Sequence, residues 1–323
     1  GNATHTTINR YQDLAKTKEI ERQEISNKTF DSVGNVVDQE VELYVSGKLS
    51  RVTAIKNSNI SNRGDAGNQE ITTYTTDSEG KNPIESSYQL ITNRVFDSDR
   101  NVLNQLSINY DKKGGVVLDV SEIRNLSFDS RGNVLSQKVA TFSDIGKKEL
   151  LDIKVITNEN LDSSGNAALV TILKFAKGAV VDGGAITEDA ASFIDATVIT
   201  TLKFDLRGNS LEQTIKKYSD SGLTKLVETQ AIKNQPYDFQ DRASRSSIIT
   251  TNSTGAFVDR QEIVYVSYDL FGNAVSQTIE RYDSTDKLID YKTILNTYAD
   301  PAAARRGNAT HTTINRYQDL AKT

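Results

Sequence analysis

The sequence predicts an all-β protein built from tandem units of about 34 residues, each contributing two strands. Three observations lead to this prediction. A turn motif recurs along the chain, the segments between turns alternate apolar and polar residues, and the last seventeen of 323 residues repeat the first seventeen. We expect the units to form a long antiparallel β-sheet that curls into a spiral, tube or shell. A parallel β-solenoid is the alternative.

The longest repeat defines the organisation of the chain. Residues 307–323 read GNATHTTINRYQDLAKT, as do residues 1–17, so the offset is 306 residues (307 − 1). This identity indicates that 1–323 is a single continuous array, in which one 306-residue period (1–306) is followed by a 17-residue overlap (307–323). An engineered duplication is the alternative. We expect any signal or anchor to lie outside these residues.

The smaller unit begins with an aromatic residue, an aspartate, two variable residues and Gly-Asn. Asp and Asn side chains bond to nearby backbone amides, and glycine adopts the positive φ that tight turns need. In the four clearest copies the turn residues are Asp31, Gly34 and Asn35; Asp129, Gly132 and Asn133; Asp205, Gly208 and Asn209; and Asp269, Gly272 and Asn273.

Five further copies are close or degraded. They begin at Leu161, Phe96 and Tyr237, and two that keep only the Gly-Asn end begin at Arg63 and Ala303. Nine units in 306 residues give a mean spacing of 34 (306/9), and the 43-residue step from 161 to 204 contains an insertion around Val180.

A second turn marker follows the first by thirteen or fourteen residues, as in YDKKGG from Tyr110 and YSDSGL from Tyr218. Two turns per unit imply two strands. The first strand is predicted at 134–142, 210–218 and 274–282, where apolar residues and Gln share one face. The second is predicted at 16–27, 147–158 and 287–296. The period therefore holds about eighteen strands, and the segment from Asp300 to Arg306 is the one place where a helical turn is expected.

Composition excludes several classes of function. The net charge is −5 with interspersed signs, so no basic patch for nucleic acid is expected. The absence of cysteine rules out disulfides, cysteine-based metal sites and a thiol nucleophile. No stretch approaches 18 apolar residues, so no membrane span is expected in this segment.

At FDSRGN from Phe128, FDLRGN from Phe204 and YDLFGN from Tyr268, the chain resembles the YD repeats of bacterial RHS-type and teneurin-like proteins. Their signature is Tyr-Asp, two variable residues and Gly on β-hairpins. This sequence departs from it because Phe often replaces Tyr, Asn follows Gly where Arg is usual, and the unit is longer. The resemblance implies a hydrated β-tube or shell at the cell surface, without catalytic residues. An unrelated β-repeat family with similar turns is the alternative.

Two sets of polar residues are candidate sites. The turn aspartates offer oxygen ligands for Ca²⁺, but the motif supplies one carboxylate where six or more oxygens are needed, so a local turn is favoured and no cofactor is expected. A glutamine recurs at one position of the apolar face, where we expect an amide ladder or the lining of a wet lumen. These glutamines are Gln39, Gln105, Gln137, Gln213 and Gln277.

Catalysis is not expected. The two histidines are His5 and its copy His311, so no nucleophile–histidine–acid arrangement is available except through one of them. The phased aromatic residues are expected to pack over the turns, with carbohydrate stacking as the alternative.

The leading hypothesis is a non-enzymatic structural protein, a segment of a giant extracellular filament, tube or stalk built from 306-residue blocks. Its expected partners are further copies of the repeat, in the same chain or in neighbouring chains. One alternative is an adhesin whose repeats bind glycans or a partner cell. The other is an RHS-like shell that encloses a toxin carried elsewhere on the chain.

Overall fold

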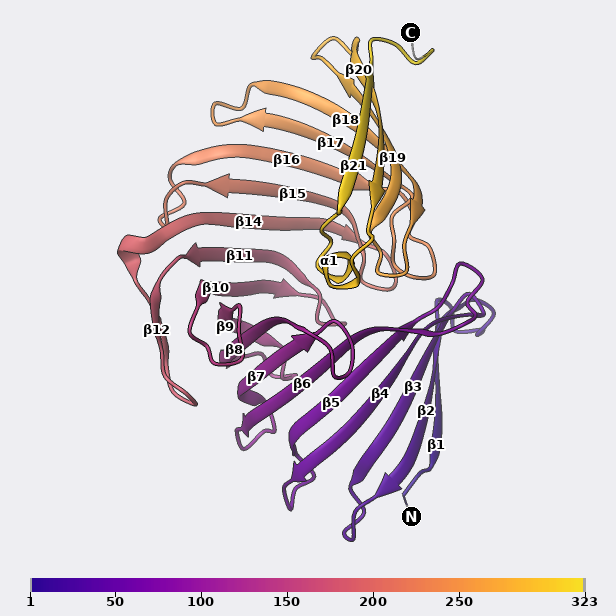
Figure 1. The fold of residues 1–323 in the computed structure, drawn as a ribbon, viewed down its shortest axis with the longest axis vertical. Coiled ribbons are helices and arrows are strands. Elements are labelled where there is room, and N and C mark those ends of the chain that lie inside the picture. The colour runs from indigo at the N-terminus through magenta and orange to yellow at the C-terminus, as the bar shows by residue number, and fades with distance from the viewer. Residues whose placement is uncertain (1, 322–323) are drawn as a thin grey trace. The chain divides into compact units, whose positions relative to one another are not determined.

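The chain folds almost entirely into antiparallel β-strands. A computed structural model describes residues 2–321, so the two ends of the predicted array, at Gly1 and Thr323, lie outside the described residues. Nineteen strands belong to one antiparallel sheet, and two more form a separate hairpin. Eighteen of the nineteen precede residue 307, as the two-strand unit predicts. The all-β antiparallel prediction is confirmed, and the parallel solenoid is wrong because consecutive strands pair as hairpins (Figure 1).

The chain divides into two compact units, which we describe separately. The first comprises residues through Ile153 together with Lys177–Glu188. Its strands β1 to β9 pair in chain order. They are β1 (His5–Tyr11), β2 (Glu19–Phe30), β3 (Val36–Val45), β4 (Lys48–Ile60), β5 (Ala66–Thr75), β6 (Ile84–Phe96), β7 (Val102–Tyr110), β8 (Val117–Phe128) and β9 (Val134–Phe142). The hairpin of β12 (Gly178–Val180) and β13 (Ile186–Glu188) also belongs to this unit.

The second unit comprises Lys154–Ala176 and residues from Asp189 onward, and β10 (Leu150–Leu161) crosses the division. Its strands again pair in chain order. They are β11 (Ala167–Phe175), β14 (Phe193–Phe204), β15 (Ser210–Tyr218), β16 (Leu226–Asn234), β17 (Arg245–Asn252), β18 (Phe257–Tyr268), β19 (Ala274–Tyr282), β20 (Leu288–Thr297) and β21 (His311–Tyr317). A 3₁₀ turn η1 (Ala190–Ser192) and one helical turn α1 (Pro301–Arg305) complete it.

The first strand of each unit lies where the pattern predicts it. Strands β9, β15 and β19 coincide with the predicted segments 134–142, 210–218 and 274–282. The second strands begin later than predicted because the turn is longer. In the turn before β10, the backbone N–H of Ser143 donates to Glu149 O at 3.1 Å, and Lys147 has a φ of 52°. Lys147 therefore belongs to the turn, and β10 begins at Leu150.

A β-bulge recurs near the end of the second strand and was not evident from the sequence. The β8–β9 register shifts between Asn125 and Ser127, and the β14–β15 register shifts between Thr201 and Lys203. An extra residue at this point increases local twist and takes a side chain out of the ladder. Leu126 is accordingly 55% exposed.

Few apolar side chains are fully buried, which fits a hydrophobic content of 37%. In the first unit Val120, Ala140 and Ile153 are fully buried. The insertion predicted around Val180 forms the β12–β13 hairpin, in which Ile186 is buried. Among residues 2–321, no helix has the length and apolar character needed to cross a membrane.

Candidate functional site

The candidate functional feature is the row of Asp-x-x-Gly-Asn turns. At Asp129 the backbone N–H donates to Asn133 O at 2.9 Å, and Gly132 N–H donates to Asp129 O at 3.1 Å. The carboxylate completes the turn, because Oδ1 accepts from the N–H groups of Arg131 and Asn133 at 2.9 Å. Its Oδ2 accepts from Asn133 Nδ2 at 2.9 Å. One aspartate thus satisfies three donors of its own turn.

The same bonds recur at the other turns of this type. In each, the aspartate Oδ2 accepts from the Asn side chain and Oδ1 accepts from the Asn backbone N–H. The aspartate–asparagine pairs are Asp31–Asn35, Asp97–Asn101, Asp162–Asn166, Asp205–Asn209 and Asp269–Asn273. The turn residues chosen from the sequence therefore lie together in each of the four clearest copies.

These hydrogen bonds stabilise the ionised carboxylate. They lower the pKa of Asp129, where the side-chain bond from Asn133 is the largest cause. The same cause lowers the pKa of the aspartates Asp31, Asp97 and Asp162.

The turns also contact one another in a regular way. The Asn side chain of one turn lies against the Gly of the next turn along the same edge. A Cβ added at Gly132 would lie 2.7 Å from Asn101 Oδ1, and one added at Gly208 would lie 2.7 Å from Asn166 Oδ1. Both glycines also have positive φ, +83° and +92°. Glycine is therefore needed here both for backbone conformation and for close approach.

Other turns repeat this contact. A Cβ at Gly64 would lie 3.0 Å from Asn35 Oδ1, and one at Gly307 would lie 3.4 Å from Asn273 Oδ1. Asn2 Nδ2 donates to Gly34 O at 3.0 Å. We call this row of Asn-to-Gly contacts the turn row. It runs within each unit along one edge of the strands.

Two turns of the row lack glycine, and an ion pair or a hydrogen bond makes the contact with the neighbouring turn instead. Arg100 takes the glycine position with a φ of 69°, and its Nε lies 2.6 Å from Asp65 Oδ1. Asp241 takes the same position with a φ of 60° and accepts from Asn209 Nδ2 at 2.8 Å. The contact between turns is thus kept where the motif is degraded.

The structure corrects one turn assignment made from the sequence. The Gly-Asn of RGDAGN, residues 67–68, lies inside β5 and forms no turn. The turn is Ser61 to Asp65, closed by Ser61 N–H to Asp65 O at 2.9 Å, with Gly64 at a φ of +85°. Ser61 replaces the usual aspartate and Asp65 replaces the usual asparagine, so the sequence motif does not identify this turn.

The predicted unit at Ala303 also differs. The helical turn α1 takes the place of the aspartate turn, and Asp300 caps it by accepting from Ala303 N–H at 2.6 Å. Asn273 Nδ2 donates to Ala304 O at 2.7 Å, so the turn row continues through α1.

Gln39 and Gln213 bond to side chains of other types, and the other predicted glutamines lie opposite residues of other types. Gln39 Nε2 donates to Asn27 Oδ1 at 2.8 Å. In register, Gln137 lies opposite Asn125, and Gln213 lies opposite Thr201. Gln105 lies opposite Ile123, and Gln277 lies between Tyr265 and Ile294 on its two neighbouring strands. Direct Gln-to-Gln bonds are not seen among the described residues, since these glutamines lie on alternate strands.

A second asparagine, not singled out from the sequence, bonds to a turn in several of the units. Asn125 Nδ2 donates to Val102 O at 2.7 Å, and Asn57 Nδ2 donates to Val36 O at 3.0 Å. The carbonyl always belongs to the residue that follows the turn. The same bond joins Asn27 to Ala3, Asn234 to Ser210 and Asn296 to Ala274. The sequence signal was Ile-x-Asn, present in EISN, AIKN, EIRN and TILN.

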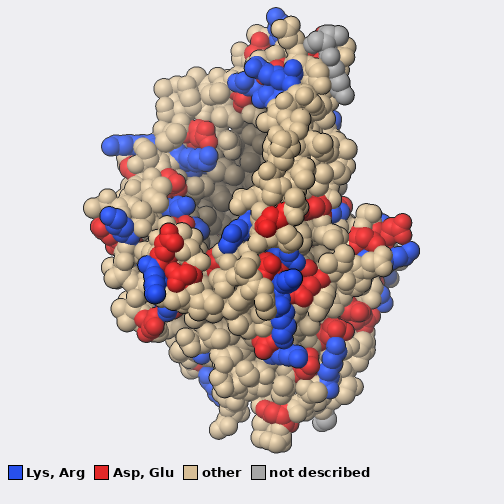
Figure 2. Space-filling model, in the orientation of Figure 1, with Lys and Arg blue, Asp and Glu red and all other residues tan. Residues whose placement is uncertain are grey.

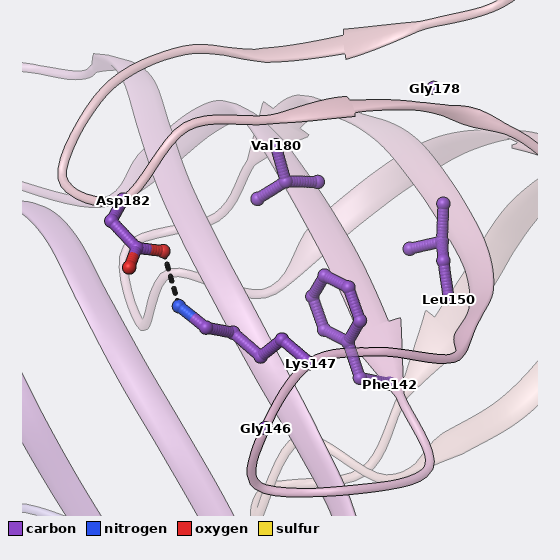
Figure 3. Close-up of a pocket in the computed structure, with 7 residues that line it drawn as sticks. All are labelled: Phe142, Gly146, Lys147, Leu150, Gly178, Val180 and Asp182. Carbon is purple, nitrogen blue, oxygen red and sulfur yellow. Dashed lines mark hydrogen bonds and ion pairs between the residues drawn. The ribbon is translucent and has the colours of Figure 1, made fainter.

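One pocket in the first unit lies between the β12–β13 hairpin and the turn after β9 (Figure 3). Its volume is about 490 Å³. The ammonium of Lys147 ion-pairs with Asp182 and lies 2.8 Å from Glu122. The lining residues are Phe142, Gly146, Lys147, Leu150, Gly178, Val180 and Asp182.

Ion pairs hold the hairpin against the sheet. Arg124 and Glu122 form a buried pair at 2.8 Å, with side chains 5% and 3% exposed. Arg124 also donates to the hairpin carbonyls of Gly184 and Val181, at 2.5 and 3.1 Å. The charged groups beside this pocket thus form ion pairs with one another, which is typical of contacts that hold a hairpin on a sheet.

Among residues 2–321, no group of three or more His, Asp or Glu side chains is arranged to hold a metal ion. Calcium binding at a turn aspartate would have to displace the hydrogen bonds described above. On the face shown in Figure 2, basic and acidic side chains are interspersed.

Comparisons with known proteins assign no family. No protein-family model and no curated protein matches the chain. Among solved structures, a crystal structure of TcdB2-TccC3 is 11% identical over 91% of this chain and 21% of that chain, with a TM-score of 0.18. A Photorhabdus luminescens Tc holotoxin pore with mutated TccC3 is 12% identical over 96% of this chain and 22% of that chain, with a TM-score of 0.16. The chain thus spans about a fifth of the length of each of these two chains.

Proposed function

We propose that this chain is a non-enzymatic structural protein, a segment of an extracellular scaffold in which 306-residue blocks follow one another. The observation that carries the proposal is the turn row. Most of its turns are closed by their own aspartate, and in several of them the Gly packs against the Asn of the preceding turn. Nearest-neighbour contacts of this kind let stability accumulate as units are added.

The use of polar groups supports a structural role. Turn carboxylates accept from their own turns, and unit asparagines donate to backbone carbonyls. The charged groups beside the pocket pair with each other. The carboxylate, amide and charged side chains described above therefore hold the backbone in place.

The finer assignment, a filament, tube or stalk at the cell surface, is part of the same proposal and follows from the resemblance of the turns to YD repeats. Electron microscopy of the native molecule, isolated from the producing cell, tests it. We expect elongated particles with a regular repeat, labelled at the cell surface by an antibody against this block. Isolated globular particles confined to the cell interior would contradict the proposal.

A further inference from the structure

The strand HTTINRY occurs twice in the chain and has a different neighbour each time. As β1 it pairs with β2, and as β21 it pairs with β20. In the described part of the chain, each copy has one partner strand in the sheet. The two copies therefore pair through opposite edges of the same strand sequence. Among the described residues, the edge paired in β1 is unpaired in β21, and the edge paired in β21 is unpaired in β1.

The contacts on the β2 edge are specific. Thr7 lies opposite Glu24 and donates to it at 2.6 Å, and His5 Nε2 lies 2.9 Å from the same carboxylate oxygen. Arg10 lies opposite Glu21, with its guanidinium 3.3 Å from the carboxylate. Side-chain charge and hydrogen bonding thus define one register on this edge.

The contacts on the β20 edge involve other neighbours. Arg316, the copy of Arg10, lies 2.7 Å from Asp290, whose side chain is 3% exposed. Thr312 donates to Asn296 Oδ1 at 2.9 Å. The arginine of HTTINRY therefore finds an acid on each edge, one seen at β1 and the other at β21.

Burial shows that each copy is incompletely covered. Ile8 in β1 is 48% exposed and Ile314 in β21 is 58% exposed. Strand β19 ends in IERY where β1 and β21 end in INRY, and it has partners on both sides. Ile279, at the matching position of β19, is only partly exposed. A second neighbour would cover Ile8 or Ile314 in the same way.

We infer that β21 is a donor strand for β2 of a second copy of this block. It would join β2 in the register that β1 shows, with Thr313 opposite Glu24 and Arg316 opposite Glu21. The inference rests on the proposed scaffold function, which it deepens by naming the partner and the register. An unpaired strand edge is a template for such addition, and exchange of identical strands is a low-cost route to association.

Arg10→Glu in the whole 323-residue chain tests the inference. The change sets two carboxylates against each other between β1 and β2, while Arg316 on β21 is untouched. Sedimentation velocity should show concentration-dependent head-to-tail association, with a midpoint concentration about fivefold below that of the parent chain. Adding Glu21→Arg should restore the β1–β2 pair, repel Arg316 and return the chain to the monomer.

Cross-linking tests the register, because the parent chain lacks cysteine. In the Arg10→Glu background, chains with Glu24→Cys are mixed with chains with Thr313→Cys. We expect a disulfide-linked dimer in about tenfold greater yield than with Thr312→Cys, whose side chain lies on the opposite face. A monomeric Arg10→Glu chain, association that persists with Glu21→Arg, or equal yields from both cysteines would overturn the inference. Fibres seen by microscopy with such results would leave the proposed function standing and exclude only this junction.

Discussion

Arg100 lies 2.6 Å from Asp65 at a point in the turn row where glycine and asparagine are usual. The Asp65 side chain is 4% exposed, and it also lies 3.1 Å from Arg63. Both members of the pair therefore depart from the motif together, and the contact between the turns is retained. This relationship makes the contact, rather than the motif, the feature that the fold requires.

A double-mutant cycle at these two residues is the first prediction. Arg100→Gly leaves Arg63 as the one cation among the described residues that ion-pairs with the buried carboxylate, and Asp65→Asn leaves the guanidinium facing an amide. Each single change should lower the midpoint of thermal unfolding. The double variant recreates the Gly–Asn contact and should unfold at a higher temperature than either single variant. Strictly additive losses would contradict a direct contact between the turns.

Gly132→Ala tests the close approach in the turn row. The added methyl group meets Asn101 Oδ1 and also has to adopt a φ of +83°. Gly272 is a matched control, because it has the same φ of +83° and open space around it. We expect Gly272→Ala to cost about 1–2 kcal/mol in the free energy of unfolding from backbone strain alone. Gly132→Ala should cost more in chemical denaturation, and equal losses would show that the turn-to-turn contact contributes nothing.

Asn125→Ala tests the asparagine that closes the unit. It removes the donor to Val102 O and leaves a part-buried carbonyl without it. A loss of about 1–3 kcal/mol in the free energy of unfolding is expected. The exposed Asn62 serves as control, since Asn62→Ala should change stability by less than about 0.5 kcal/mol. A neutral Asn125→Ala would show that the Ile-x-Asn pattern has no structural role.

Arg124 should dominate the attachment of the β12–β13 hairpin. Arg124→Ala removes bonds to two hairpin carbonyls and one partner of Glu122. A loss of about 3 kcal/mol is expected, because the change leaves a buried carboxylate with Lys147 as its remaining cation. Limited proteolysis should then cut near Gly183. The exposed pair Lys81–Glu79 is the control, and Lys81→Ala should cost below about 1 kcal/mol.

Stability should fall in acid because of the turn aspartates. Their folded-state pKa values are lowered, chiefly by the side-chain bond from the turn asparagine, whereas the ordinary value is 3.8. A lowered folded pKa contributes stability above the unfolded pKa, and that contribution is lost as the pH falls through the folded pKa. Denaturation curves should therefore change little from these groups between pH 7 and about 5 and weaken progressively below about 4. Full stability retained at pH 2 would contradict this assignment.

Much of the fold follows from local sequence rules. The aspartate and glycine of FDSRGN specify a turn through side-chain capping and positive φ, and alternation specifies the strand from Val134 to Phe142. Both effects act within a few residues, so they can be predicted from the sequence alone. The turn at Ser61 was not predicted, because Ser61 and Asp65 form the hydrogen bonds that aspartate and asparagine form in the other turns.

What escaped prediction depends on partners far along the chain. The contact of Asn101 with Gly132 and the bond from Asn125 to Val102 join residues 23 to 31 positions apart. Neither member of such a pair needs its partner for its own local conformation. The hairpin that contains Val180 was evident as extra length, but its anchoring through Arg124 arises only in three dimensions.

Amide hydrogen exchange along HTTINRY tests the central claim, that consecutive blocks continue one another through this strand. It compares the 323-residue chain with a chain of two consecutive 306-residue blocks. In the single chain, the amides of β21 that point away from β20 should exchange rapidly. In the two-block chain, the same amides at the junction should become protected to the degree expected for β19, which has a partner strand on each side. Rapid exchange at the junction in both chains would contradict the account.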